Sequence, residues 1–207
     1  MTKLLVLTLL TVTANLTVAQ NMQVEVYSSL TLGRVREKVE DDLTQQNAFG
    51  TLARFPSIGV NVDVGLGENT MFETGLNYSA RGSKVFESEF KFDYLDIPLN
   101  FVIQPKNFRV FFGPQFSILA GSKLDGQDAS VAIENTDFGI RYGLGVEKRK
   151  YSVRLIFQNG FKDVFRDTRY KWRSNAINIA IGYIVLRKHG GSATTNDPLK
   201  GHRERDF

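Results

Sequence analysis

The chain of 207 residues has 23% charged residues, 12% aromatic residues and 18 glycines, a composition that fits one domain of ordinary size. It contains no cysteine, which excludes a disulfide framework, a thiolate metal site, a cysteine nucleophile and an N-terminal lipid-modified cysteine. The formal net charge of +4 is mild and requires no nucleic-acid partner.

The first segment has the plan of a secretory signal peptide. Lys3 precedes the apolar run 4–12, and the small residues of 17–19 precede Gln20. Since the apolar run is shorter than the roughly 20 residues of a spanning helix, a membrane anchor is disfavoured. We therefore expect residues 1–19 to be removed by cleavage between Ala19 and Gln20.

We assign residues 20–187 to one β-barrel, because hydrophobic residues recur at every second position through most of this range. In IGVNVDVGL, residues 58–66, β-branched and leucine residues alternate with glycine, asparagine and aspartate. Such alternation is typical of β-strands, and no amphipathic helical pattern of any length competes with it. Eight strands are predicted, at residues 23–36, 55–66, 69–84, 90–103, 108–122, 136–147, 150–160 and 174–187.

The two faces of these segments differ in a way that a soluble protein does not explain. One face is long, apolar and uncharged, as in Phe72, Leu76, Tyr78 and Ala80 of the third segment. A soluble sandwich or barrel turns its apolar face inward and covers its outside with charged residues. Here the opposite face is rich in glycine and serine, which suits the crowded interior of a narrow barrel, so the apolar face is expected to contact lipid.

Nine charged residues fall on the polar face, five acidic and four basic: Glu25, Asp63, Glu73, Arg81, Asp96, Arg109, Arg141, Glu147 and Arg154. An eight-stranded barrel has an interior just wide enough for side chains. This favours a structural charge network over the alternative, a gated ion path, with Glu73, Arg81, Asp96, Arg109, Arg141 and Arg154 as its members. Because Pro98 removes a ladder hydrogen bond, we also expect a local irregularity beside Asp96.

The connections between the predicted strands alternate in length. Short turns fall at 67–68, 104–107 and 148–149, and longer polar loops near 37–54, 85–89, 123–135 and 161–173. Outer-membrane barrels have tight periplasmic turns and longer exterior loops, and a closed barrel satisfies every backbone hydrogen bond in lipid. The sequence therefore predicts an all-β fold, an eight-stranded antiparallel transmembrane β-barrel of the outer membrane with both termini in the periplasm.

Several sequence blocks resemble a known family. The chain reads ETGLNYSARGSK at 73–84, YLDIPL at 94–99, FFGPQFSILAG at 111–121, FGIRYGLGVE at 138–147 and INIAIGYIV at 177–185. These blocks resemble the PorT-type outer-membrane β-barrel family of the Bacteroidota, over nearly the whole mature chain. The resemblance implies an eight-stranded barrel and, from the namesake member, an accessory role in type IX protein secretion. Unlike many such barrels, the chain continues after its last strand into a tail.

Catalytic chemistry has little support in the sequence. Both histidines, His189 and His202, lie in the tail, where a serine–histidine hydrolase could not use them. A site based on lysine or carboxylates is an alternative to which no motif points, and the acidic run EKVEDD lacks the spacing of a calcium loop. We expect no enzyme activity, cofactor or metal.

The predicted exterior loop 161–173 interleaves aromatic residues with five basic and two acidic residues. Contact with lipopolysaccharide phosphates is one interpretation, an interfacial aromatic anchor a second, and a merely solvated loop a third; binding of single-stranded nucleic acid is disfavoured on an exterior loop. The candidate contact residues are Arg166, Arg169, Lys171, Trp172 and Arg173.

The tail, residues 188–207, is rich in glycine, serine and threonine and is expected to be disordered; a periplasmic partner is the alternative. For the whole chain the leading hypothesis is a non-enzymatic structural or interaction component of the outer membrane, with lipid, lipopolysaccharide and cell-envelope or secretion proteins as partners. The alternatives are a small barrel that passes or binds a solute, and a soluble lipocalin-like carrier.

Overall fold

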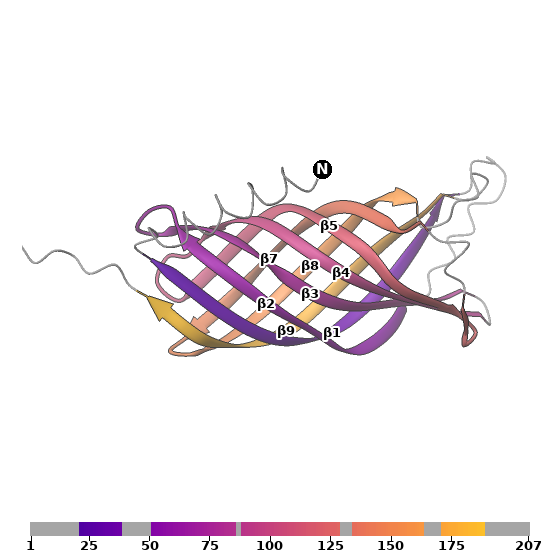
Figure 1. Cartoon of the computed structure of the whole chain (residues 1–207), viewed down its shortest axis with the longest axis horizontal. Helices are drawn as coiled ribbons and strands as arrows, with labels where there is room; N and C mark the ends of the chain where they lie inside the picture. Colours follow the sequence, from indigo (N-terminus) through magenta and orange to yellow (C-terminus); the bar gives the residue numbers. More distant parts are fainter. Residues whose placement is uncertain (1–20, 39–50, 86–87, 129–133, 164–170, 189–207) are drawn as a thin grey trace, which may run out of the picture.

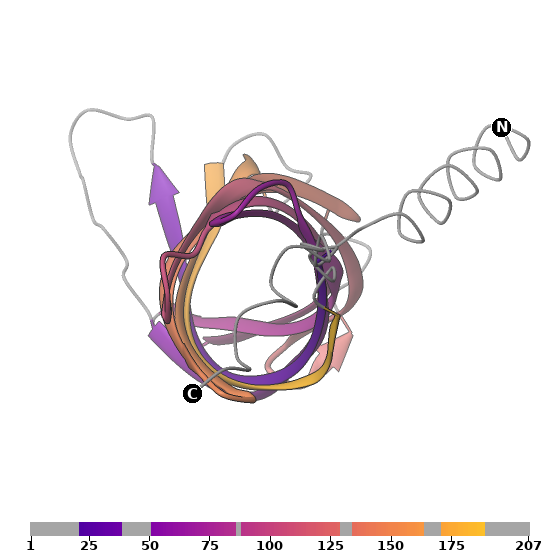
Figure 2. The same cartoon turned by 90° about the vertical axis from the view of Figure 1, so that its left-hand side faces the viewer.

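The computed structural model describes residues 21–38, 51–85, 88–128, 134–163 and 171–188, which form a closed antiparallel barrel (Figures 1 and 2). The strands are β1 (Met22–Lys38), β2 (Thr51–Gly65), β3 (Thr70–Val85), β4 (Ser88–Ile103), β5 (Phe108–Leu124), β6 (Gln127–Asp128), β7 (Thr136–Lys148), β8 (Tyr151–Asp163) and β9 (Lys171–Lys188). Pairing of β1 with β9 and of β4 with β5 closes a ring of eight long strands, while the two-residue β6 pairs only with β5. No helix among these residues could cross a membrane.

The predicted barrel and its eight long strands are confirmed, and so is the assignment of the two faces. Along β7 exposed and buried residues alternate without a break: Phe138 and Val146 point outward, whereas Asp137 and Glu147 are buried. Ala80 is an exception, since only 4% of it is exposed. Its assignment to the outer face was wrong because β2, the strand beside it, is no longer paired with β3 at this level.

The loops at one end are shorter than the sequence predicts, because the strands continue past the apolar band. β2 begins at residue 51, β8 ends at 163 and β9 begins at 171, so the expected loops 37–54 and 161–173 are partly strand. Only residues 86–87 separate β3 from β4. The added segments read TLAR at 51–54, FKD at 161–163 and KWR at 171–173, and the hydrophobic alternation that marks a strand in the sequence is lost in them.

The ladder on both sides of Pro98 is interrupted, as expected for a residue without an N–H. Between β3 and β4 the pairs Thr74–Leu99 and Asn77–Asp96 flank the gap. The register is the same on both sides of it, so the irregularity costs ladder contacts and leaves the alignment of the strands unchanged.

The barrel wall divides between β2 and β3 at the loop end. The pairing of these strands stops at Ile58–Tyr78, although β2 extends back to Thr51 and remains paired with β1. The end of β1 approaches β3 here, and a side-chain carbon at Gly33 would lie 2.6 Å from the backbone nitrogen of Gly82. Glycine is therefore required at this crossing.

Arg54 bridges the divided wall. Its Nη1 donates to the carbonyl oxygens of Arg81 (2.8 Å) and Phe92 (3.1 Å) and to Oδ1 of Asp93 (2.8 Å). The hydroxyl of Ser57 adds a second link by accepting from the backbone N–H of Ala80 at 2.9 Å. Side-chain hydrogen bonds thus replace the missing ladder.

Arg54→Ala is expected to loosen this end of the barrel and to leave the rest intact. The lost charge-assisted hydrogen bonds correspond to about 1–3 kcal/mol, and hydrogen–deuterium exchange should become faster in residues 51–57 and 79–84 but not in 138–147. Lys91→Ala is the control, since Lys91 only pairs with Glu89 in an exposed ion pair of small value. Equal exchange in both variants would show that Arg54 does not close the wall.

Candidate functional site

The barrel interior is densely polar. Among the described residues, six carboxylates and four arginines are buried: Glu25, Asp63, Glu73, Asp96, Asp137, Glu147, Arg81, Arg109, Arg141 and Arg154. No lysine with a described side chain is buried; arginine offers five donors in a fixed plane and so can satisfy several acceptors at once. Such charges are tolerated away from water only when they are paired and hydrogen-bonded.

Small residues on neighbouring strands make room for the large interior side chains. Tyr27 pairs with Gly59 on one side and Gly182 on the other. Phe111 likewise lies opposite Gly143, where a side-chain carbon would be 2.6 Å from the phenylalanine ring. The glycines of the polar face are thus part of the packing of a narrow interior.

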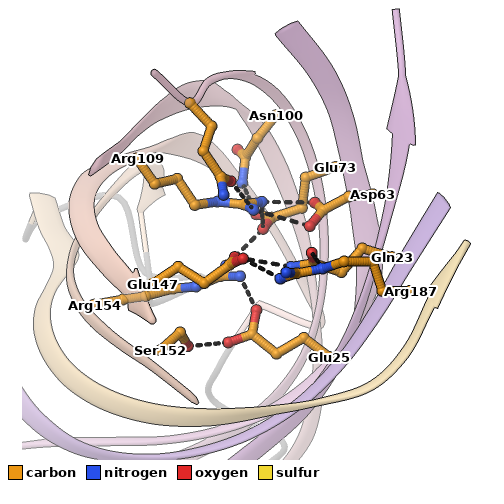
Figure 3. A network of polar contacts seen from close by, with 11 residues as sticks. Gln23, Glu25, Asp63, Glu73, Asn100, Arg109, Glu147, Ser152, Arg154 and Arg187 are labelled. Carbon is orange, nitrogen blue, oxygen red and sulfur yellow. Dashed lines mark hydrogen bonds and ion pairs between the residues drawn. The ribbon is translucent and has the colours of Figure 1, made fainter. Parts of the chain in front are cut away.

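Glu73 on β3 is the centre of a network near the turn end of the barrel (Figure 3). Its Oε2 accepts from Nη2 of Arg109 and from Nη1 of Arg154, each at 2.6 Å, and its Oε1 accepts from the amide of Asn100 at 2.7 Å. Arg109 also binds both oxygens of Asp63, at 2.6 and 2.9 Å. One carboxylate therefore joins two arginines that come from β5 and β8.

The same network continues toward the turns. Arg154 forms a second ion pair with Glu25, which also accepts from the hydroxyl of Ser152. Closer to the opening, Glu147 pairs with Arg187 and accepts from the amide of Gln23 at 3.0 Å (Figure 3). Outside this group the barrel opens into a vestibule of about 480 Å³, lined in part by Gln23, Asp63, Glu147 and Arg187.

An apolar layer lies on the other side of the Glu73 network. Val102, Phe111, Ile156 and Ala180 are buried together, with Tyr27 and Met71 packed against them. The guanidinium carbon of Arg154 lies 6.0 Å from the centre of the Phe111 ring, and that of Arg141 lies 5.7 Å from it, so the ring contacts a cation toward each end of the barrel. This layer separates the polar interior into two parts.

The part toward the loops is a second network, linked across six strands. Nη2 of Arg81 binds both oxygens of Asp96 at 2.7 Å, and Asp96 accepts from the amide of Gln158 at 3.3 Å. From Gln158 the hydrogen bonds continue to Asn178, then to Thr31 and finally to Ser57. Arg141 lies between this network and the apolar layer, where the amide of Asn77 can accept from its Nη1 at 2.8 Å.

The structure places all six network residues proposed from the sequence inside the barrel and joins five of them in two groups. Glu73, Arg109 and Arg154 meet at the turn end, Arg81 and Asp96 meet toward the loops, and Arg141 joins neither ion-paired group. The sequence alone indicated a single network. Two groups form because the apolar layer occupies the middle of the interior.

The predicted exterior contact residues are only partly described. Arg166 and Arg169 lie outside the described residues, as do Ala19, Gln20 and the tail after Lys188. Lys171, Trp172 and Arg173 were assigned to a loop, which was wrong, since they begin β9 and pair with Lys38, Glu37 and Arg36. Continued pairing with β1 keeps this segment extended beyond the apolar band.

Several interior residues were missed by the sequence reading. Asp137 is buried at the loop end, where it accepts from the backbone N–H of Lys162 at 3.2 Å, and Arg54 and Arg187 also enter polar networks. All three lie at or beyond the edge of the clear alternation. Asp137 already lies inside the predicted strand 136–147, directly before the outward Phe138, so the same period of two puts it on the polar face.

Chemically, the interior can hold charges in fixed positions but offers little space for a solute. The described residues contain no group of histidine and acidic side chains arranged to hold a metal ion. Beyond the vestibule the networks and the apolar layer occupy the cross-section, which is what an eight-stranded barrel permits. The interior of the barrel is therefore filled by hydrogen-bonded polar side chains and by the apolar layer.

A closed antiparallel barrel with an uncharged apolar outer band and a polar interior defines a transmembrane β-barrel. Residues 18–166 match the family described as outer membrane protein beta-barrel domain. The chain belongs to this family, and its location is the outer membrane.

Solved structures share the fold at low sequence identity. Neisserial surface protein A is 10% identical, with a TM-score of 0.50 over 76% of this chain and 96% of that one. Ail, the attachment invasion locus protein of Yersinia pestis, is 10% identical (TM-score 0.45; 80% and 98% covered), and OprG from Pseudomonas aeruginosa is 9% identical (TM-score 0.43; 83% and 97% covered). No curated protein matches the chain by sequence.

Proposed function

We propose that this chain is a non-enzymatic anchor of the outer membrane that presents its loop end to protein partners, as an accessory of type IX secretion. The observation that carries the proposal is the filled interior: two polar networks and an apolar layer occupy it. A barrel filled in this way serves as a rigid support, because breaking buried ion pairs to admit a solute is costly.

The projecting strands support the same role. β1, β2 and β9 extend past the apolar outer band at the loop end, and Arg54 holds the divided wall there. Strand extensions held by side-chain hydrogen bonds form a rigid platform, which lowers the entropy cost of binding a partner. In this proposal the three tight turns and both termini face the periplasm, and the exterior loops, including Arg166 and Arg169, contact partners or lipopolysaccharide.

The type IX assignment comes from the resemblance to PorT-type barrels and is tested by co-purification. The full chain, a chain ending at Lys188 and a chain with residues 39–50 replaced by a short glycine–serine linker are isolated from native outer membranes in mild detergent. Ending at Lys188 preserves every pairing of β9 with β1. We expect secretion components to accompany the full chain and to be lost from at least one altered chain.

Two results would contradict the proposal in different ways. If secretion components are absent while other envelope proteins depend on the loops or tail, the anchor role stands and the secretion role fails. If no chain retains any partner and the full chain conducts ions in planar bilayers, the anchor role itself fails and the alternative of a small transport barrel replaces it.

A further inference from the structure

The outer surface of the barrel is hollowed at one place. A groove of about 650 Å³ crosses the lipid-facing side of β9, β1, β2 and β3, with Val26, Ser28, Ile58, Leu76, Tyr78 and Ile181 in its lining. This volume falls within the range of about 300–1,000 Å³ that is usual for small-molecule sites. Tyr27, Gly59 and Gly182 of the interior face border the groove from below, but its outward-facing lining plays no part in the proposed anchor function.

Ser28 is the reason for the hollow. It lies on the outer face between the pairing partners Ile58 on β2 and Ile181 on β9, where neighbouring outward positions carry larger side chains. Serine leaves space between these two isoleucines, of which Ile58 is 54% exposed and Ile181 is 65% exposed. The site is therefore a trough with apolar walls, suited in shape to a single extended hydrocarbon chain.

Basic residues gather where the groove reaches the turn end. Tyr151 and Tyr183 line that end, with their rings 5.5 Å apart in an edge-on contact, and Nζ of Lys150 lies 5.9 Å from the centre of the Tyr183 ring. The backbone carbonyl of Lys150 accepts from the N–H of Ile184 at 2.8 Å, which ties this turn to β9. The ammonium group of Lys150 thus lies near an aromatic pair, and tyrosines of this kind are typical of a membrane–water interface.

The charge at this turn is not neutralised by neighbouring residues. Lys148, Arg149 and Lys150 are consecutive, and no ion pair between described residues involves any of them. The nearest carboxylate along the chain, Glu147, points inward and is paired with Arg187. Arg149 lines the vestibule, whereas Lys148 pairs with Tyr151 and Lys150 lies over Tyr183, so an anionic group at this end of the groove would meet two basic side chains without an internal competitor.

We propose that this groove is a binding site for one anionic phospholipid, with its phosphate at Lys148 and Lys150 and an acyl chain along Tyr183 and Ile181 to Ser28. Two features of the outer surface select this occupant: an apolar trough in the part of the wall that faces hydrocarbon, and an unpaired basic turn at one end of that trough. In the orientation of the proposed function, the site faces the periplasmic leaflet.

Native mass spectrometry of the folded full chain tests the proposal, with dioleoylphosphatidylglycerol as the anionic probe and dioleoylphosphatidylcholine, a zwitterion of zero net charge, as its comparison. We expect one phosphatidylglycerol molecule to be retained at higher activation energy than any phosphatidylcholine. Lys150→Gln is expected to weaken this retention about fivefold, and Ser28→Phe, which fills the trough, on the order of tenfold.

Matched controls separate a site from general lipid contact. Lys106→Gln removes a positive charge from another turn, and Ala120→Phe enlarges an exposed residue of β5, a strand that does not line the groove; neither is expected to change retention. Equal retention in the wild type and all four variants would overturn the proposal, because only general annular lipid would then be bound. If Ser28→Phe fails to fold, the proposal is decided by whether Lys150→Gln weakens the retention of phosphatidylglycerol more than Lys106→Gln does.

Other occupants give distinguishable results. A dimer that Ser28→Phe converts to a monomer would assign the groove to a second copy of the chain and overturn the lipid site. Preferential retention of lipopolysaccharide over phosphatidylglycerol would also overturn it and would reverse the proposed orientation, without bearing on whether the interior is plugged.

Discussion

Glu73→Leu is expected to cost about 3–5 kcal/mol of unfolding free energy, or to prevent folding into lipid vesicles altogether. Glu73 is buried and accepts three hydrogen bonds, from Arg109, Arg154 and Asn100. Leucine is similar in size but leaves two buried guanidinium groups short of a carboxylate, and an uncompensated buried charge is far more costly than a lost surface pair. Urea titration of the refolded barrel in vesicles, followed by circular dichroism, measures the change.

Two controls distinguish charge from size and from position. Glu73→Gln keeps acceptor and shape but removes the charge, so its cost is expected to fall between those of the wild type and Glu73→Leu. Glu68→Gln, at an exposed turn, is expected to change the unfolding free energy by less than about 0.5 kcal/mol. A cost for Glu73→Leu no larger than that of Glu68→Gln would mean that the network does not stabilise the barrel.

Phe111→Ala is expected to open the interior. Phe111 is the largest member of the apolar layer and contacts the guanidinium groups of Arg141 and Arg154. Its truncation removes the side chain that separates the two polar networks, so the variant is expected to show discrete ion conductance in planar bilayers that the wild type lacks. It should also lose about 3–5 kcal/mol of stability, less whatever entering water recovers.

Phe112→Ala is the matched control for this experiment. It removes the same ring from the adjacent residue of the same strand, but Phe112 points to the lipid and contacts the ring of Phe101 edge-on. We expect no conductance from it. Conductance in the unmodified chain, or equal conductance in both variants, would show that the apolar layer does not seal the barrel and would favour the transport alternative.

The amino-acid sequence by itself determined the strands, their two faces and the nine charges that point inward. A period of two follows directly from strand geometry, since successive side chains point to opposite sides, and a closed barrel leaves only two environments to assign. The sequence also contains a local signal for one further, short strand. Asp125 and Gly126 both have positive φ, and an Asp-Gly pair is a strong hairpin signal that would have predicted β6 beside β5.

Only the tertiary structure decided which interior residues meet. Glu73 and Arg154 are 81 positions apart in the chain, and Arg54 reaches Asp93 because the wall divides between β2 and β3. Periodicity fixes the face of a residue but not its height along the barrel, which depends on the register of every pair around the ring. For the same reason the sequence indicated one charge network, whereas closure of the barrel brings Phe111, Val102 and Ile156 to one level and separates the charges into two.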